Sequence, residues 1–250
     1  PKPDKIALLS DKLDVPYDQM VSLKLDKNLA PIGDLLRSKI LKEIPLDLFG
    51  IKESNLIDIV ANAPAKVNAF ISTIIKIAQH YNFRKESFYL ASVRSFQEAN
   101  NNYFDELEQS VLKFVKAYHI DLNQEISSKE LEEILVEEYG YIVKGNELSK
   151  YEALGTLRSV FVPKTKTLLL TNEIDESQRT FIYAKELAYN YLEFKERLYT
   201  FPWIKFDTFD QVLNNFYASY FAGALIIPNA KITNQLNEIF EKDTFDTKSF

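Results

Sequence analysis

The stretch from Asp175 to Pro228 constrains the fold more than any other part of the sequence, because it predicts two consecutive buried helices. In the first helix, apolar and aromatic residues recur at the spacing of a helix with one buried face. They are Phe181, Ala184, Leu187, Ala188, Tyr191 and Leu192. The second begins with a capping-box pattern, Thr208 and Gln211, and is apolar on nearly every side until Pro228 ends it. A helix that is apolar all round belongs in the middle of a fold, so we predict that both helices form the core.

The two helices resemble those of the ImmA/IrrE family, zinc-peptidase-like domains that often follow a helix-turn-helix in bacterial and phage regulators. In that family the first helix carries His-Glu-x-x-His. The second carries a Glu six residues before a Phe-Ala pair, and an apolar run ending in Pro follows. Here the first motif reads KELAY over 185–189, and the second reads NFYASYFA over 215–222, followed by LIIP over 225–228. The resemblance covers about 125–230 and implies a zincin-like fold.

The residues at the metal-ligand positions of this frame differ from those of the family. Lys185 and Tyr189 stand where the family has its two His residues, and Asn215 stands at the third ligand position. A catalytic zinc needs three ligands of the His, Glu, Asp or Cys kind. A protonated Lys has no lone pair, and a neutral Tyr or an amide is a poor ligand. Of the family's site, Glu186, the general base, remains. We therefore expect no metal, no cofactor and no catalysis.

Five residues make up the candidate ligand site. Lys185 lies near the vacated metal position, where its ammonium would offer positive charge to an anionic ligand, and Tyr189 lies one turn along the same face. Glu186 and Asn215 belong to the same motif frame, and Trp203 lies in the aromatic loop between the helices. The alternative is that the motif residues are ordinary surface residues of a scaffold domain. On that interpretation the aromatic loop only closes an edge of the core.

The residues before the first motif helix predict a further helix and a small sheet. Ser127 and Glu130 form a capping box ahead of the helix KELEEILVEEYG, which Gly140 ends. Strands are predicted at 141–143, 157–162 and 167–171, with a turn at 163–166 that makes the last two a hairpin. This order of helix, small antiparallel sheet and motif helix is that of the ImmA/IrrE domain. The predicted fold class is mainly α (α+β), with a helical N-terminal region followed by a zincin-like domain.

The N-terminal half is predicted to be helical. Residues 3–26 predict two short helices and are similar to the last helices of an XRE-type helix-turn-helix. Further helices are predicted at 29–48, ending near Pro45, and at 63–81. Residues 85–118 contain no Pro or Gly and predict one helix of about 30 residues, about 45 Å long. That helix is either a core helix or a strut for a homodimer, because regulators of palindromic sites act as two-fold dimers.

Three segments follow from these patterns. Residues 1–28 are a remnant of a helix-turn-helix domain, 29–122 a helical linker or dimerisation region, and 123–250 an ImmA/IrrE-like domain. The chain starts at Pro1 without a Met, has a net charge of −6 and shows no Lys/Arg cluster of the kind that marks a nucleic-acid surface. We therefore expect a fragment of a regulator whose contacts with DNA come from a missing N-terminal domain.

Composition excludes two other classes of protein. The 250 residues include no Cys, which excludes a disulfide scaffold and suits a reducing cytoplasm. No apolar run approaches the ~18–20 residues that a membrane span needs. The expected location is therefore the cytoplasm, with no membrane partner.

The resemblance implies the regulatory part of a bacterial DNA-binding transcriptional regulator. Some XRE-type regulators of this build are similar to regulators of short-chain fatty-acid and acyl-CoA metabolism, so the expected effector is a small acyl-derived anion. Its binding would favour one dimer geometry and so alter half-site spacing on DNA. Two alternatives stay open. One is a metallopeptidase that cleaves a partner repressor, and the other is a protein-interaction scaffold that binds no small effector.

Overall fold

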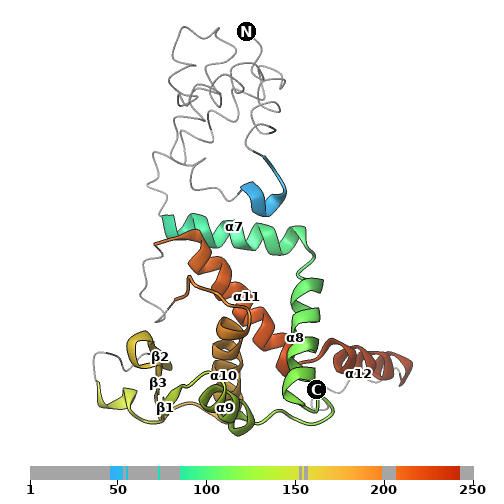
Figure 1. The fold of residues 1–250 in the computed structure, drawn as a ribbon. Helices are drawn as coiled ribbons and strands as arrows, with labels where there is room; N and C mark the ends of the chain where they lie inside the picture. Colours follow the sequence, from blue (N-terminus) through green and yellow to red (C-terminus); the bar gives the residue numbers. More distant parts are fainter. Residues whose placement is uncertain are drawn as a thin grey trace, which may run out of the picture. The chain divides into compact units, whose positions relative to one another are not determined.

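The computed structural model describes residues 46–52, 55, 73, 85–151, 154, 157–198 and 207–242 (Figure 1). The chain divides into two compact units, Pro1–Asn101 and Asn102–Phe250. The predictions for residues 3–26, for the helix ending near Pro45, for nearly all of 63–81 and for Trp203 lie outside the described residues.

The first unit contains two described elements, the short 3-10 helix η1 (Leu46–Phe49) and the α-helix α7 (Lys85–Ala99). Phe49 of η1 meets Phe96 of α7 edge to face, with ring centroids 6.4 Å apart. Gly50 follows η1 with a φ of 65°, a left-handed conformation that suits glycine because it has no Cβ. This conformation turns the chain directly after η1.

The single helix predicted over 85–118 is wrong, because the chain forms two helices there, α7 and α8 (Asp105–Tyr118). Asn101 and Asn102 lie between them with φ values of 53° and 55°, in the left-handed region that a continuing helix cannot use. Asn enters this region more readily than most residues because its short side chain bonds locally. The side chain of Asn100 donates to the Phe96 carbonyl at 2.8 Å. The boundary between the two compact units falls between Asn101 and Asn102.

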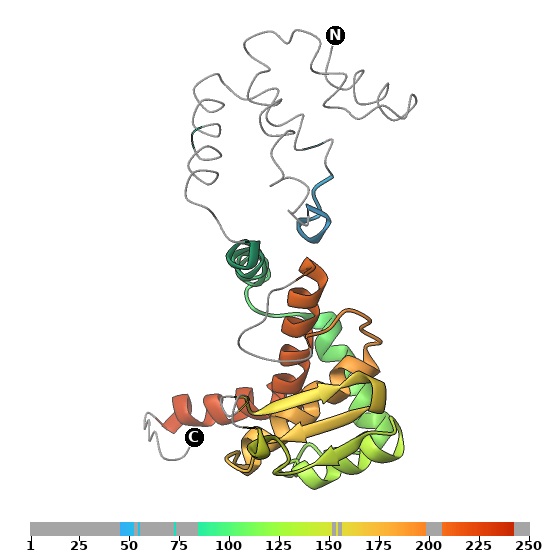
Figure 2. The same ribbon diagram turned by 90° about the vertical axis from the view of Figure 1, so that its left-hand side faces the viewer.

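The second unit contains a three-stranded sheet in the order β1-β3-β2, drawn side by side in Figure 2. The strands are β1 (Ile142–Lys144), β2 (Ser159–Val162) and β3 (Thr167–Leu170). β2 and β3 form the predicted antiparallel hairpin, with Phe161 opposite Leu168. β1 runs parallel to β3, with Val143 opposite Leu168.

The sheet is therefore mixed, and the prediction of an antiparallel sheet is wrong in this detail. The chain passes from β1 through the 3-10 helix η2 (Leu148–Lys150) before it enters the hairpin. Because of that connection, β1 pairs with the edge of β3 that β2 does not occupy, and it runs parallel to β3. The predicted class, mainly α with a small sheet (α+β), is confirmed.

The two motif helices, α10 (Glu176–Tyr191) and α11 (Phe209–Ile226), pack against each other in the core as predicted. Each begins at a side-chain cap: Asp175 accepts from the Gln178 N–H at 2.7 Å, and Thr208 accepts from the Gln211 N–H at 3.3 Å. Eight side chains of the pair are completely shielded from solvent. They are Tyr183, Ala184, Leu187, Ala188, Ala218, Phe221, Ala222 and Leu225.

One residue of the predicted apolar face does not lie in the core. Phe181 is 38% exposed, whereas Tyr183 is fully buried. The hydroxyl of Tyr183 donates to Glu132 of α9 (Ser128–Glu137) at 2.9 Å, so this polar tip is satisfied and the ring can point inward. The buried face of α10 is therefore rotated toward Tyr183.

Helices α8 and α9 cover the motif pair, α8 against α11 and α9 against α10. The Phe114 ring of α8 meets Tyr191 and Phe221 at centroid distances of 5.1 and 5.5 Å. The predicted cap of α9 is confirmed, since the Ser127 side chain accepts from the Glu130 N–H at 3.2 Å. Burial of each large apolar side chain contributes about 1.5–3 kcal/mol, so this packing fixes α10 and α11 firmly.

The last described helix, α12 (Asn229–Lys242), follows Pro228, which ends α11 as predicted. Within the described ranges, no helix combines the length and the apolar character that crossing a bilayer requires.

Candidate functional site

The structure brings Lys185, Tyr189 and Asn215 together. Lys185 and Tyr189 lie one turn apart on α10, so their side chains leave the same face, and Asn215 comes from the first half of α11. Lys185 Nζ donates to Asn215 Oδ1 at 2.8 Å, and the Tyr189 hydroxyl donates to the same oxygen at 3.3 Å. Lys185 and Tyr189 therefore meet at the amide oxygen of Asn215, and the three residues at the ligand positions of the motif form one hydrogen-bonded group.

Lys185 is a partly buried cation. Burial lowers the pKa of Lys185 to about 8, because removing the ammonium from water disfavours its charged form. The negative charge of Glu186 opposes this shift, and the positive charge of Arg197 adds to it. At pH 7 the side chain is still mainly an ammonium, but one that is easily deprotonated.

Glu186 leaves α10 in another direction and is bound on both carboxylate oxygens. Arg197 Nη2 donates to Oε1 at 2.7 Å and to Oε2 at 2.6 Å, and the Tyr141 hydroxyl donates to Oε2 at 3.0 Å. Glu186 and Arg197 are each 8% exposed and Tyr189 is 3% exposed. The alternative that Glu186 and Tyr189 are ordinary surface residues is therefore wrong.

The guanidinium of Arg197 is stacked between two aromatic rings. Its Cζ lies 4.2 Å from the Phe161 ring centroid and 4.3 Å from that of Tyr189. Burial acts to lower the pKa of Arg197, but the Glu186 carboxylate and the Tyr141 hydroxyl together more than offset this, and the net shift is upward. Arg197 is therefore a permanent buried cation beside the site.

The hydrogen bonds among Lys185, Tyr189 and Asn215 form the first network of the site, and those around Glu186 and Arg197 form the second. Tyr141 belongs to the second network. Its hydroxyl donates to Glu186 and accepts from Asn190 Nδ2 at 2.9 Å and from Arg197 Nη1 at 3.3 Å. Burial, with a further contribution from Glu186, raises the pKa of Tyr141 to about 12, so the phenol keeps its proton. Its ring stacks on Phe161, with centroids 4.9 Å apart. The network therefore joins α10 to the sheet side of the unit.

Sequence reasoning missed Arg197, Tyr141 and Phe161. Arg197 follows Glu186 by eleven residues, in an aromatic stretch with no helical or strand period, and the other two lie on the sheet side of the unit. Only Glu186 carried a signal, as the one retained motif residue. The partners of Glu186 are brought to it only by the packing of α10 against the sheet side of the unit.

The chain reverses direction after α10, and this brings Arg197 back to Glu186 on that helix. Glu193 adopts a left-handed φ of 55°, and the Phe194 N–H donates to the Tyr189 carbonyl at 3.1 Å. Asn214 of α11 donates through Nδ2 to the Glu196 carbonyl at 2.8 Å. These contacts fix residues 193–197 between α10 and α11.

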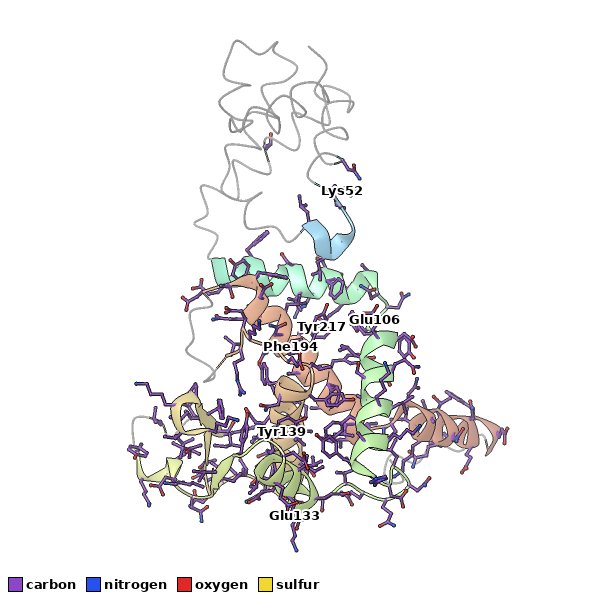
Figure 3. The ribbon with its side chains drawn as sticks, viewed as in Figure 1. Lys52, Glu106, Glu133, Tyr139, Phe194 and Tyr217 are labelled. Atoms are coloured by element: carbon purple, nitrogen blue, oxygen red, sulfur yellow. The ribbon has the colours of Figure 1, made fainter. Side chains whose placement is uncertain are left out.

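A row of aromatic rings extends from the site. Phe194 meets Tyr189 edge to face at 6.4 Å and stacks on Tyr217 of α11 at 6.1 Å, centroid to centroid. Figure 3 shows Phe194 and Tyr217 close together beside α11. Both side chains are only partly buried. These two partly exposed rings are therefore linked to the polar group through Tyr189, whose ring contacts Phe194 and whose hydroxyl bonds Asn215.

The residues present do not fit a zinc ion. Lys185 and Arg197 bring two positive charges against the single carboxylate of Glu186, and a dication would be repelled by the excess. In the part of the chain that the structure describes, no three His, Cys, Asp or Glu side chains gather as a metal-binding group. Of the five predicted ligand-site residues, Trp203 lies outside the described residues, and its role stays a prediction.

Comparisons with known proteins add one similarity. No protein-family model matches the chain, and no curated protein matches it. Among the solved structures that match is a Mycobacterium tuberculosis transcriptional regulator, with 19% identity and a TM-score of 0.47. The match covers 60% of this chain and 44% of that chain, so it spans less than half of that regulator.

Proposed function

We propose that the second unit is the ligand-sensing part of a bacterial transcriptional regulator, built on a zincin-like helix pair that has lost its metal. Convergence of Lys185, Tyr189 and Asn215 on one hydrogen-bonded group carries this proposal. In place of a metal, the former ligand positions hold a cation and polar side chains. We take the effector to be a small acyl-derived anion, because the group has one positive charge in excess.

The metallopeptidase alternative needs a carboxylate that takes a proton from metal-bound water. Both oxygens of Glu186 accept hydrogen bonds from Arg197, and one also accepts from Tyr141. A general base must lie within hydrogen-bond reach of the proton that it takes, and here donors from the protein already occupy both carboxylate oxygens. The geometry therefore favours a sensing role for the site over a hydrolytic one.

In the proposed mechanism, effector binding shifts a population of conformations. A ligand acts only through its different affinity for two states, so it must bind one arrangement of α10 and α11 more tightly. A homodimer with DNA-binding domains contributed by the N-terminal part of the protein would convert that shift into a change of operator affinity.

Metal content and effector binding together test the proposal. Elemental analysis of the purified, untagged chain should find far less than one zinc per chain, with Glu186→Gln as the control. A thermal-shift screen should then find a short-chain acid or an acyl-CoA that raises the Tm of the wild type. The shift should vanish in Lys185→Met and persist in Lys129→Met, a matched change at a side chain that is 87% exposed.

Near-stoichiometric zinc, lost together with thermal stability on chelation, would overturn the proposal in favour of the peptidase. If no anion of the panel shifts the Tm, or if the shift is the same in Lys185→Met, the scaffold alternative takes its place.

A further inference from the structure

The orientation of Asn215 determines which hydrogen-bonding groups the site offers to a ligand. Its Oδ1 accepts from both Lys185 and Tyr189, which uses both lone pairs of that oxygen. The Nδ2 group, on the other side of the amide, carries two N–H donors. Lys185 has three N–H donors, of which one is directed at Oδ1. Within the described part of the chain, Lys185 Nζ and Asn215 Nδ2 therefore offer donors, while the one acceptor of this pair, Asn215 Oδ1, is already used by Lys185 and Tyr189.

Such a pair of donors with one excess positive charge favours a ligand group that accepts hydrogen bonds and carries one negative charge. A carboxylate has two oxygens that only accept, and it carries one negative charge. A carboxamide of the same shape would bring an N–H group to one of these two donors in place of an accepting oxygen. A thioester carbonyl oxygen would accept from one of these donors, but it has no negative charge to pair with the Lys185 ammonium.

Arg197 does not take part in this recognition. Its guanidinium is bound to both oxygens of Glu186 and is enclosed by Phe161 and Tyr189. A ligand that displaced it would leave the buried Glu186 carboxylate without its counter-charge, which is costly. The binding charge must therefore come from Lys185.

The apolar neighbours of the pair complete the description of the ligand. Phe194 contacts Tyr189, and Tyr217 stacks on Phe194, so partly exposed rings adjoin the polar group. Burying methylene groups against such rings contributes about 0.8 kcal/mol each. The favoured ligand has an acid group and a hydrocarbon part.

We propose that the site binds the free carboxylate of a monocarboxylic acid, held by Lys185 Nζ and Asn215 Nδ2, with its hydrocarbon chain against Phe194 and Tyr217. This inference rests on the proposed sensing function and narrows its effector to the free acid. The acyl-CoA thioester is then not the ligand of the site.

Isothermal titration calorimetry of the full chain tests this with three probes of one acyl length: butyrate, butyramide and butyryl-CoA. Butyrate should bind, and both butyramide and butyryl-CoA should bind at least tenfold more weakly. Asn215→Asp should weaken butyrate binding at least tenfold, because it replaces the Nδ2 donor with a second negatively charged oxygen. That variant should keep its fold, since the new carboxylate would still accept from Lys185, and circular dichroism checks this.

The outcomes separate this inference from the proposed function. Butyramide binding as well as butyrate, or full butyrate affinity in Asn215→Asp, would overturn the carboxylate assignment. Binding of butyryl-CoA without butyrate would overturn it too, while leaving the sensing function intact. If none of the three probes, nor any anion of the wider panel, binds, both proposals fail.

Discussion

Replacing Lys185 with Met removes a largely buried charge while keeping an unbranched side chain of nearly the same length. The folded protein holds the pKa of Lys185 at about 8, against an ordinary value of 10.5, chiefly because of burial. Between these two pH values the unfolded chain binds a proton that the folded chain has released. Stability therefore rises with pH across this window, and below pH 8 the full cost of the buried ammonium is present.

The size of this cost follows from the two pKa values. Each pH unit corresponds to about 1.4 kcal/mol, so a pKa of about 8 instead of 10.5 costs the folded state about 3 kcal/mol at neutral pH. By pH 10 the wild type should have regained about 2 to 3 kcal/mol relative to Lys185→Met. Tyr141, whose pKa is raised to about 12, stays neutral over this range and does not obscure the effect.

Urea unfolding at pH 7, 8, 9 and 10 measures this difference. Trp203 is the only Trp of the sequence and belongs to the second unit, so its fluorescence reports on the relevant part of the chain. Titrations elsewhere cancel when the free energy of unfolding of Lys185→Met is subtracted from that of the wild type. Lys129→Met, at an exposed position, should show no such pH dependence. A difference that stays flat from pH 7 to pH 10 would refute the assignment of Lys185 as a buried, desolvated cation.

Two further predictions concern the second network. Arg197→Met should lower the free energy of unfolding by about 3–5 kcal/mol, because it leaves the buried Glu186 carboxylate without a counter-charge. Adding Glu186→Gln should recover part of the loss, and a double variant no more stable than Arg197→Met would contradict this. Tyr141→Phe should cost about 1–2 kcal/mol, because its hydroxyl bonds Glu186 and Asn190 in a buried position. Tyr151→Phe, at a side chain that is 51% exposed, is the control, and equal losses in the two variants would contradict the role of Tyr141.

The motif frame and the helix starts were predictable because their signals are local. Thr208 and Gln211 lie three residues apart, and the spacing of Lys185 and Tyr189 places them on one helix face whatever the rest of the chain does. The pairing of these two residues with Asn215 follows once the two helices are adjacent. Thus the sequence predicted which residues form the first network, but it did not predict the hydrogen bonds between them.

The remaining features depend on contacts between distant segments or on weak local signals. Arg197 meets Glu186 only because the chain reverses at Glu193, a non-glycine residue in a left-handed conformation that no sequence pattern marked. The break between α7 and α8 rests on Asn101 and Asn102, which lack the strong signal of Gly or Pro. The parallel pairing of β1 arises from the path of the connection before the hairpin, and strand sequences alone do not encode that path.

Tyr189 belongs to both networks of the site. Its hydroxyl donates to Asn215, and the face of its ring carries the guanidinium of Arg197. The two networks therefore share a side chain, and the free energies of changes in them should not add. Such linkage is reciprocal: if a bound ligand alters the strength of the Glu186–Arg197 pair, then a change in that pair alters the affinity for the ligand by the same factor. On the proposed function, a change at a residue on the sheet side such as Tyr141 would then alter the affinity of a site that it does not touch.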